Sequence, residues 1–204
     1  MLTRGGFFLS PLPEVGGGEG EDETRKPAIY TKEQILAYSN GNPSEGFGDR
    51  YRMFDAGAGR KIARLPGPPF QFMDRVTAVR GEPWQMTAGA HAEAQYDIPA
   101  DAWYFGADRQ PRMPFSVLLE AALQPCGWLA SYVGSALTTD QDLYFRNLDG
   151  TATWSREVLP TSGTLRTRAN ITNVSRSAGM IIESFEVQFL LVDETVYEMR
   201  TVFG

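Results

Sequence analysis

The sequence has few of the residues that metal sites and disulfide frameworks require. Its 204 residues include one cysteine and one histidine, which excludes a disulfide framework and most zinc sites. The formal net charge is −6, and this acidic balance argues against binding of nucleic acid, which needs a basic surface. No apolar run reaches the ~20 residues of a membrane-spanning helix. We therefore expect a soluble, cytoplasmic protein that needs no bound cofactor and that contacts neither nucleic acid nor a membrane.

What the sequence does contain is typical of a globular domain, with 42% hydrophobic and 22% charged residues. Its beginning differs, because residues 16–23 combine glycine with acidic side chains and include no apolar one. Such a stretch buries too little surface to offset its ordering entropy. We predict a flexible tail over residues 1–26 and a single folded domain over residues 27–204. The chain stops at Gly204 without a polar tail, so we expect it to be cut from a longer polypeptide.

Hydrophobic periodicity predicts one short and one long helix. Thr31 and Gln34 have the spacing of a capping box, and the helix that they start should stop at Asn40 and Gly41. The long helix is predicted over residues 114–137 and is apolar on nearly every side, which is typical of a buried helix. Pro125 lies inside it and predicts a local bend or an overwound turn.

Strand patterns surround the long helix. Before it, residues 85–96 predict a strand and residues 70–76 predict either a strand or a short helix, while residues 42–63 read as irregular. After it, strand patterns cover residues 143–148, 165–172, 181–191 and 195–203. This order predicts an α+β fold in which an antiparallel sheet wraps around one long central helix.

A stripe of polar residues runs along the long helix. Ser116, Glu120, Gln124, Gly127 and Ser131 follow one another at spacings of three or four residues, which places them on one face. A glutamate in such an apolar helix is costly to bury without a partner, and such residues occur at functional sites or in paired structural networks. The residues alone leave both readings open, the structural one being a helix edge that faces solvent or a dimer seam.

Other candidates for chemistry are weaker. His91 is a general base by residue type, but Ala90 and Ala92 place it in a strand, where a lone histidine is more often a surface or hydrogen-bonded residue. We expect Cys126 on the apolar helix to be a small core residue. No glycine-rich phosphate loop, dinucleotide-binding fingerprint or serine elbow is present.

Several segments together resemble a known family, the bacterial 3-hydroxydecanoyl-acyl-carrier-protein dehydratases, which have the hotdog fold. These segments are EAQYDIP at 93–99, DAWYFG at 101–106, Met113 with Pro114, and LEAALQ at 119–124. Two further segments, QPCGW at 124–128 and FRNLDG at 145–150, are similar to dehydratase-like domains of polyunsaturated fatty acid synthases and related polyketide synthases. The resemblance covers the chain from about residue 28 to its end and implies a hotdog fold.

The active site of that family combines a histidine and a carboxylate from opposite hotdogs of a pair. The resemblance places Glu120 at the carboxylate position, with Gln124 one helical turn later. It places Asp108 at the histidine position, in a loop that is shorter than the family motif. An aspartate with an ordinary pKa of about 3.9 is a weak base at neutral pH. We therefore expect Asp108 to be inactive and the isolated chain to lack the catalytic histidine.

The resemblance implies action on 3-hydroxyacyl thioesters carried on the phosphopantetheine of an acyl carrier protein. It also implies pairing with a histidine-bearing second hotdog, or a homodimer when the chain is isolated. Two alternatives stay open: a thioesterase in which Glu120 or Asp108 activates water, and a non-catalytic acyl-binding or scaffold domain. Arg109 and Arg112, just before the helix, are either partner contacts or solvated loop residues. Substrate contacts are expected from Gln124, Met113, Pro114, Phe115, Trp103 and Phe105.

Overall fold

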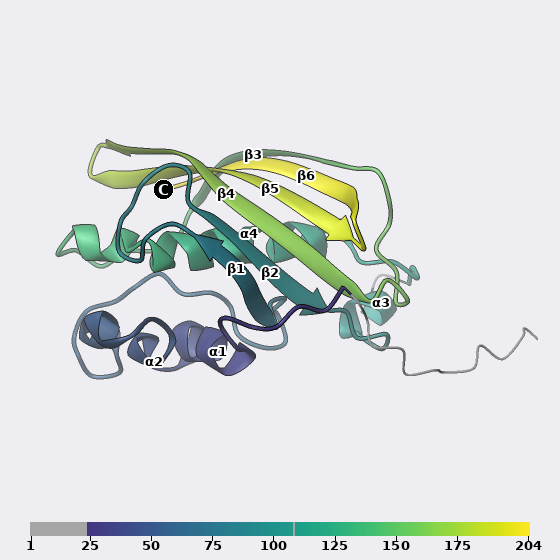
Figure 1. Cartoon of the computed structure of the whole chain (residues 1–204), viewed down its shortest axis with the longest axis horizontal. Coiled ribbons are helices and arrows are strands. Elements are labelled where there is room, and N and C mark those ends of the chain that lie inside the picture. The colour runs from purple at the N-terminus through teal and green to yellow at the C-terminus, as the bar shows by residue number, and fades with distance from the viewer. Residues whose placement is uncertain (1–23, 108) are drawn as a thin grey trace, which may run out of the picture.

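The structure is a computed structural model that describes residues 24–107 and 109–204 (Figure 1). Within these residues, six strands form one sheet in the order β1-β2-β4-β5-β6-β3, and every neighbouring pair is antiparallel. Most of the predicted tail, residues 1–23, lies outside the described residues. The strands are β1 (Arg75–Arg80), β2 (His91–Asp97), β3 (Asn147–Trp154), β4 (Thr164–Ser177), β5 (Met180–Leu191) and β6 (Glu194–Phe203).

Helix α4 (Phe115–Tyr132) lies against one face of this sheet and contacts β2, β4 and β5 (Figure 1). The strands bury alternate residues against it: Phe185 and Val187 of β5 are buried, whereas Glu186 between them is exposed. Alternating burial of this kind is what one covered face of a sheet produces. The predicted α+β fold, with an antiparallel sheet around one long helix, is confirmed.

The long helix is shorter than the prediction of residues 114–137. It ends at Tyr132 because Gly134 adopts a left-handed backbone with φ of 81°, a conformation that glycine takes at no steric cost. A 3-10 turn, η2 (Ser135–Thr138), follows. Pro125 lies inside the helix, and the bend or overwound turn expected there stays a prediction.

A layer of short helices lies beside α4, next to the β1 side of the sheet (Figure 1). Helix α1 (Lys32–Asn40) starts with the predicted capping box, in which Thr31 and Gln34 bond reciprocally. Helix α2 (Pro43–Phe47) and the 3-10 helix η1 (Asp49–Phe54) occupy a segment for which the sequence predicted irregular structure. Phe47 fixes this layer, because its ring lies 4.8 Å from Tyr38 of α1 and 5.6 Å from Trp128 of α4.

Two predicted strands are displaced in the structure. The strand predicted over residues 85–96 begins only at His91, and the strand predicted over residues 143–148 begins only at Asn147. Leu143 and Phe145 instead pack against the core from an irregular segment, so their alternation reflects burial without strand structure. Helix α3 (Trp103–Ala107) lies between β2 and α4 in the chain. Across the described part of the chain, no helix is long and apolar enough to cross a membrane.

Candidate active site

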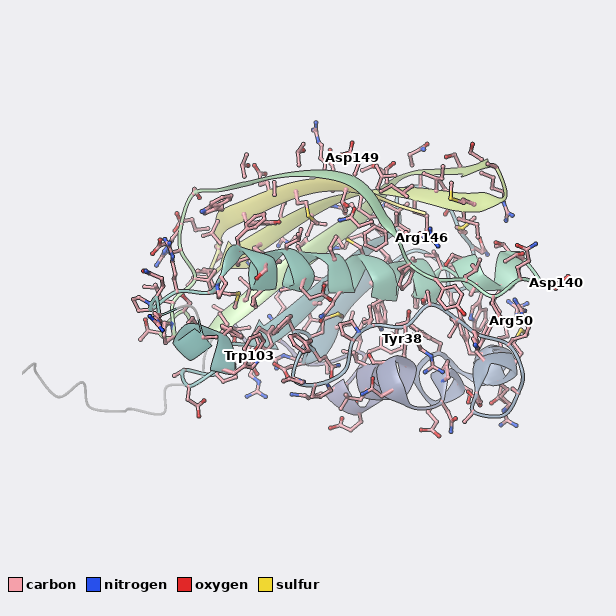
Figure 2. All side chains as sticks on the ribbon, turned by 180° about the vertical axis from the view of Figure 1, so that it is seen from behind. Tyr38, Arg50, Trp103, Asp140, Arg146 and Asp149 are labelled. Atoms are coloured by element: carbon pink, nitrogen blue, oxygen red, sulfur yellow. The ribbon has the colours of Figure 1, made fainter. Side chains whose placement is uncertain are left out.

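A groove of about 320 Å³ lies beside the first half of α4. Helix α4 contributes Ser116, Val117 and Glu120, and α3 contributes Trp103. Figure 2 shows Trp103 at this end of the molecule, with Tyr38 and Arg146 towards the other end of α4. The rest of the described lining comes from the segment before β1, namely Pro66, Phe70 and Phe72. The structure therefore brings Glu120 and Trp103 together, as expected of the site, and adds an aromatic wall.

Gln124 connects the carboxylate to this wall. Its side chain is buried, and its Nε2 donates hydrogen bonds of 3.0 Å to Glu120 Oε1 and 2.7 Å to the carbonyl oxygen of Phe70. Its Oε1 accepts a hydrogen bond of 2.7 Å from the backbone N–H of Phe72. A buried amide with its bonds satisfied on both sides is a rigid element. Gln124 thus fixes the position of Glu120 relative to Phe70 and Phe72.

Trp103 forms the opposite border of the groove and is tied to the same segment. Its Nε1 donates a hydrogen bond of 3.1 Å to the carbonyl oxygen of Pro69, and its ring meets Phe70 edge-on at 5.3 Å. Trp103 and Phe70 are each about half exposed. Large aromatic rings that stay exposed on a fixed backbone are typical of a surface that receives a ligand or a partner.

Three predicted substrate contacts at the start of α4 lie elsewhere. Met113 is buried, and its backbone N–H donates to the carbonyl oxygen of Val158 at 2.8 Å. Pro114 is the residue before the helix, and its carbonyl oxygen accepts bonds from the first turn. Phe115 is exposed and packs on Trp154 of β3 at 5.2 Å. None of the three is among the described lining of the groove.

Helix α3 and the loop between it and α4 carry the other predicted residues. Phe105 packs on the neighbouring tyrosine ring of α3 at 4.7 Å and does not line the groove. Arg112 forms an exposed ion pair with Glu157, so its charge is already matched within the chain. Arg109 is exposed, and Asp108 lies outside the described residues.

Neither His91 nor Cys126 belongs to the groove. His91 Nδ1 lies 2.7 Å from Asn170 Oδ1 in the register pair that links β2 to β4. Cys126 is buried, its thiol donates to the carbonyl oxygen of Ala122 at 3.4 Å, and burial raises the pKa of the thiol. Because a raised pKa disfavours the thiolate, Cys126 is an inert core residue. The expectations that His91 is hydrogen-bonded and that Cys126 belongs to the core are confirmed.

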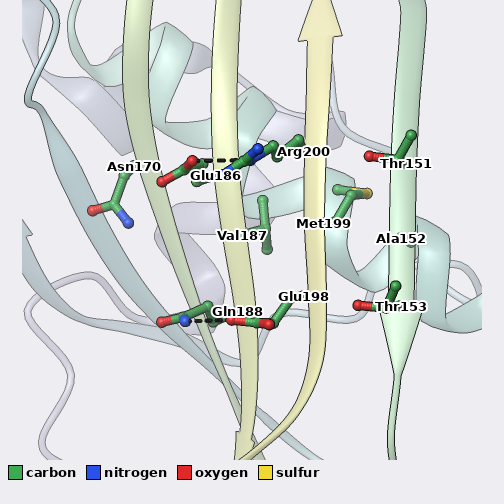
Figure 3. A pocket seen from close by; sticks show the side chains of 10 residues that line it. All are labelled: Thr151, Ala152, Thr153, Asn170, Glu186, Val187, Gln188, Glu198, Met199 and Arg200. Atoms are coloured by element: carbon green, nitrogen blue, oxygen red, sulfur yellow. Dashed lines mark hydrogen bonds and ion pairs between the residues drawn. The ribbon is translucent and has the colours of Figure 1, made fainter.

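A second hollow, of about 390 Å³, lies on the outer face of the sheet (Figure 3). Its charged and amide side chains bond to one another across the strands. Arg200 donates to Glu186 at 3.1 Å, and Gln188 donates to Glu198 at 2.9 Å (Figure 3). These groups satisfy each other, so this face reads as a solvated surface, and the groove beside Glu120 is the stronger candidate.

The sequence did not indicate that Phe70 and Phe72 form a wall of the site. A signal was present, because these two rings alternate around Gln71 after a stiff proline-rich stretch and therefore share one side of an extended chain. Their contact with Gln124 spans 52 and 54 residues of sequence. No local pattern reports a contact over such a separation.

Comparison with known proteins places this geometry in a family. The model of the FabA-like domain matches residues 65–200, which is about two thirds of the chain. The chain belongs to the FabA-like domain family. The matched residues include α3, α4, the strands β1 to β5 and most of β6, and therefore the groove and Glu120.

One sequence relative and one solved structure are similar to this FabA-like domain. One polypeptide of the polyunsaturated fatty acid synthase of Thraustochytrium sp. is 29% identical over 170 residues, which cover 71% of this chain and 11% of that protein. The chain thus spans only a small part of that relative. A solved structure, the dehydratase heterocomplex ApeI:P from Xenorhabdus doucetiae, matches with a TM-score of 0.51 and 14% identity, covering 67% of this chain and 84% of that one. The fold is the hotdog that the resemblance implied.

Proposed function

We propose that this FabA-like domain supplies the carboxylate half of a dehydratase site for 3-hydroxyacyl thioesters, and that a second hotdog supplies the histidine. One observation carries the proposal. Glu120 lines an aromatic groove and is positioned by Gln124, whereas no histidine is among the described lining of that groove. The single histidine of the sequence, His91, bonds to Asn170 on the sheet.

The chemistry requires two groups. A base removes a proton from C2 of the acyl chain, and an acid gives a proton to the hydroxyl that leaves C3, so that water and a C2–C3 double bond form. Glu120, when protonated, is the acid of this scheme, and Gln124 donates to its Oε1. Ser116 and Val117 of the first turn of α4 also line the groove. The positive end of the helix dipole there favours negative charge on the thioester oxygen.

The proposal assigns the groove to an acyl chain that arrives on a phosphopantetheine arm. The exposed rings of Trp103 and Phe70 at its border offer apolar contact to such a ligand. The carrier is an acyl carrier protein, and the reaction needs no further cofactor. The proposal also keeps the cytoplasmic location that the sequence led us to expect.

The open edge of the sheet supports pairing with a second hotdog. The β1 edge is partly covered, because Ile29 donates to the carbonyl oxygen of Val76 at 2.8 Å and Val76 donates to Tyr30 at 3.0 Å. The β3 edge has no such cover among the described residues, and nearly all of β3 is exposed. An uncovered strand edge is a template for pairing with another chain. The Phe115–Trp154 contact places this edge beside the start of α4, so a partner on β3 also lies next to the helix that carries Glu120.

A two-part assay tests the proposal. A 3-hydroxyacyl-pantetheine thioester is incubated with the isolated chain, and both enoyl product and free thiol are measured. We expect neither product from the chain alone, and enoyl product after addition of a hotdog domain that carries the family histidine. Robust dehydration by the isolated chain that survives Asp108→Asn and His91→Ala would contradict the proposal. Thiol release in place of enoyl product would identify a thioesterase.

A further inference from the structure

Glu183 occupies a core position of β5. Phe185, Val187 and Phe189 point to the inner face of the sheet and are buried, and Glu183 continues the same alternation with a residue exposure of 4%. Its Oε1 is buried and accepts no hydrogen bond from the described residues. A carboxylate at such a position is costly unless something bonds to it. The fold therefore keeps an unused acceptor inside its apolar face.

The other buried glutamate of the sheet shows what a satisfied carboxylate looks like. Glu93 has an exposure of 3% and forms ion pairs with Lys26 at 2.6 Å and Arg168 at 2.9 Å. Burial by itself would raise the pKa of Glu93, but these two cations hold that pKa below its usual range. Glu183 has no such cations, and burial raises its pKa to about 7. Among the described residues, no cation forms an ion pair with Glu183 as Lys26 and Arg168 do with Glu93.

Glu183 lines a pocket of about 360 Å³. A cavity needs only about 10–15 Å³ to hold one water, so this space accommodates more than a single bridging water. The pocket lies at the end of α4 marked by Tyr38 and Arg146, away from Trp103 (Figure 2). Its apolar lining includes Ile62, Ala63, Leu143, Phe145 and Phe203.

The pocket is separate from the groove beside Glu120. The two share no lining residue. Between them the helix is closed over at Gly127, where an added Cβ would lie 3.0 Å from side-chain atoms of both Leu65 and Phe145. An acyl chain in the groove therefore does not continue into the pocket, and Glu183 needs a ligand of its own.

The electrostatics of the pocket favour a cation. Ser131, in the last turn of α4, lines it, and this turn carries no basic residue. The negative end of the helix dipole thus adds to the charge of Glu183. Asp142 and Arg146 line the pocket too, but both are exposed and opposite in sign. The charges of Asp142 and Arg146 offset each other. The net negative charge of the pocket therefore comes from Glu183 and the C-terminal end of α4.

The remaining ionisable groups near Glu183 do not change this balance. Tyr38 and Cys126 are buried, and burial raises the pKa of each, so both stay neutral near pH 7. Arg60 Nη2 donates to the carbonyl oxygens of Ala136, Thr139 and Gln141. Arg64 Nη1 donates to the carbonyl oxygens of Tyr38 and Gly41, so backbone oxygens hold both guanidinium groups. No group of three or more metal-ligating side chains occurs in the described residues. A hard divalent ion needs about six oxygen ligands, so an organic cation fits better.

We propose that the Glu183 pocket binds a primary ammonium group on a short unbranched apolar stem, with Glu183 as its acceptor. The ammonium satisfies the carboxylate, and the stem contacts the apolar walls. The chemistry is shared by a free alkylamine and by a lysine side chain of a neighbouring protein. This site is independent of the proposed dehydratase chemistry.

Calorimetry with n-pentylammonium chloride tests the site, with 1-pentanol as its neutral counterpart. At about pH 8, where an alkylamine with a pKa of about 10 is still charged, we expect saturable binding of the amine by the whole chain. Glu183→Gln should weaken it about tenfold or more, as for loss of a charge-assisted hydrogen bond. The matched control is Glu186→Gln. Glu186 lies on the exposed face of the same strand and accepts a hydrogen bond from Arg200, so this variant should bind pentylammonium as tightly as the unchanged chain.

The pH dependence provides a test that needs no variant. Affinity for the amine should fall about tenfold per unit as the pH drops below about 7, because Glu183 then binds a proton, whereas pentanol should show no such trend. Nα-acetyl-lysine methylamide distinguishes the two sources of the ammonium group. If this compound binds as tightly as pentylamine, the natural ligand is a lysine side chain of a protein. If only pentylamine binds, the natural ligand is a free amine. Equal affinities for amine and alcohol, full binding by a folded Glu183→Gln variant, or no saturable binding of the amine would each overturn the proposal.

Discussion

Gln124 donates a hydrogen bond of 3.0 Å to the carboxylate of Glu120, one helical turn earlier on α4. The same amide bonds to both Phe70 and Phe72, which belong to the wall of the groove. The carboxylate and the surface that would receive an acyl chain are therefore positioned by one side chain. This arrangement explains why a polar residue lies at a buried position of an otherwise apolar helix.

Replacing Gln124 by leucine should destabilise the fold. The variant leaves the N–H of Phe72 and the carbonyl of Phe70 without partners, at about 1–3 kcal/mol for each group, so we expect a loss of about 2–6 kcal/mol in the free energy of unfolding. Urea denaturation measures it. Gln188→Leu is the control, because the side chain of Gln188 donates to the exposed Glu198 on the surface of the sheet, and this variant should lose less than about 1 kcal/mol. Equal losses in both variants would show that Gln124 has no such bridging role.

The sequence predicts half of this arrangement. The spacing of Glu120 and Gln124 places them on one face of a helix, and the structure confirms their contact. The bonds to Phe70 and Phe72 were not predictable, because they depend on how the segment before β1 crosses the helix. The same limit explains the strand predicted over residues 143–148, where alternating burial comes from contact with the core and not from pairing.

The sequence contains one unusual feature at Glu183, because a charged residue interrupts the apolar alternation of a predicted strand. The alternation along residues 181–191 is apolar at every second position except 183, and such an interruption marks a strained or functional site. The strand that this alternation predicted is confirmed, but the exception at 183 predicts neither burial nor a pocket. Only the structure shows that the carboxylate is buried and that its Oε1 lacks a partner among the described residues.

Glu183 should make stability fall as the pH rises towards neutrality. Its pKa is raised from 4.5 to about 7 in the folded state, so between these values the folded protein binds more protons than the unfolded one. The free energy of unfolding should therefore decrease from about pH 4.5 to about pH 7, by up to about 3 kcal/mol from this group, and level off above. Thermal unfolding of Glu183→Gln across this range should lack the decrease. A variant whose pH profile parallels that of the natural sequence would contradict the burial of an unpaired carboxylate.

Association should depend on the β3 edge. Trp154 is exposed on β3 and contacts only an exposed ring, Phe115, among the aromatic contacts of the described residues. Trp154→Glu should thus leave the fold intact and weaken pairing with a second hotdog by about tenfold or more, as for loss of an aromatic anchor. Light scattering over a concentration series measures the change. Met180→Glu, an exposed apolar residue of β5, is the control, and equal effects of the two substitutions would exclude β3 as the pairing edge.

The central claim is that Glu120 serves as the acid of a shared dehydratase site. The most direct measurement is the rate of enoyl formation in a mixed pair, in which the partner hotdog keeps its histidine but has its own carboxylate changed to the neutral amide. With the natural chain this pair should be active, and Glu120→Gln should lower the rate by about 10²- to 10⁴-fold, while Glu198→Gln on the outer face of the sheet should not change it. A pair that forms normally and keeps its full rate with Glu120→Gln would contradict the claim.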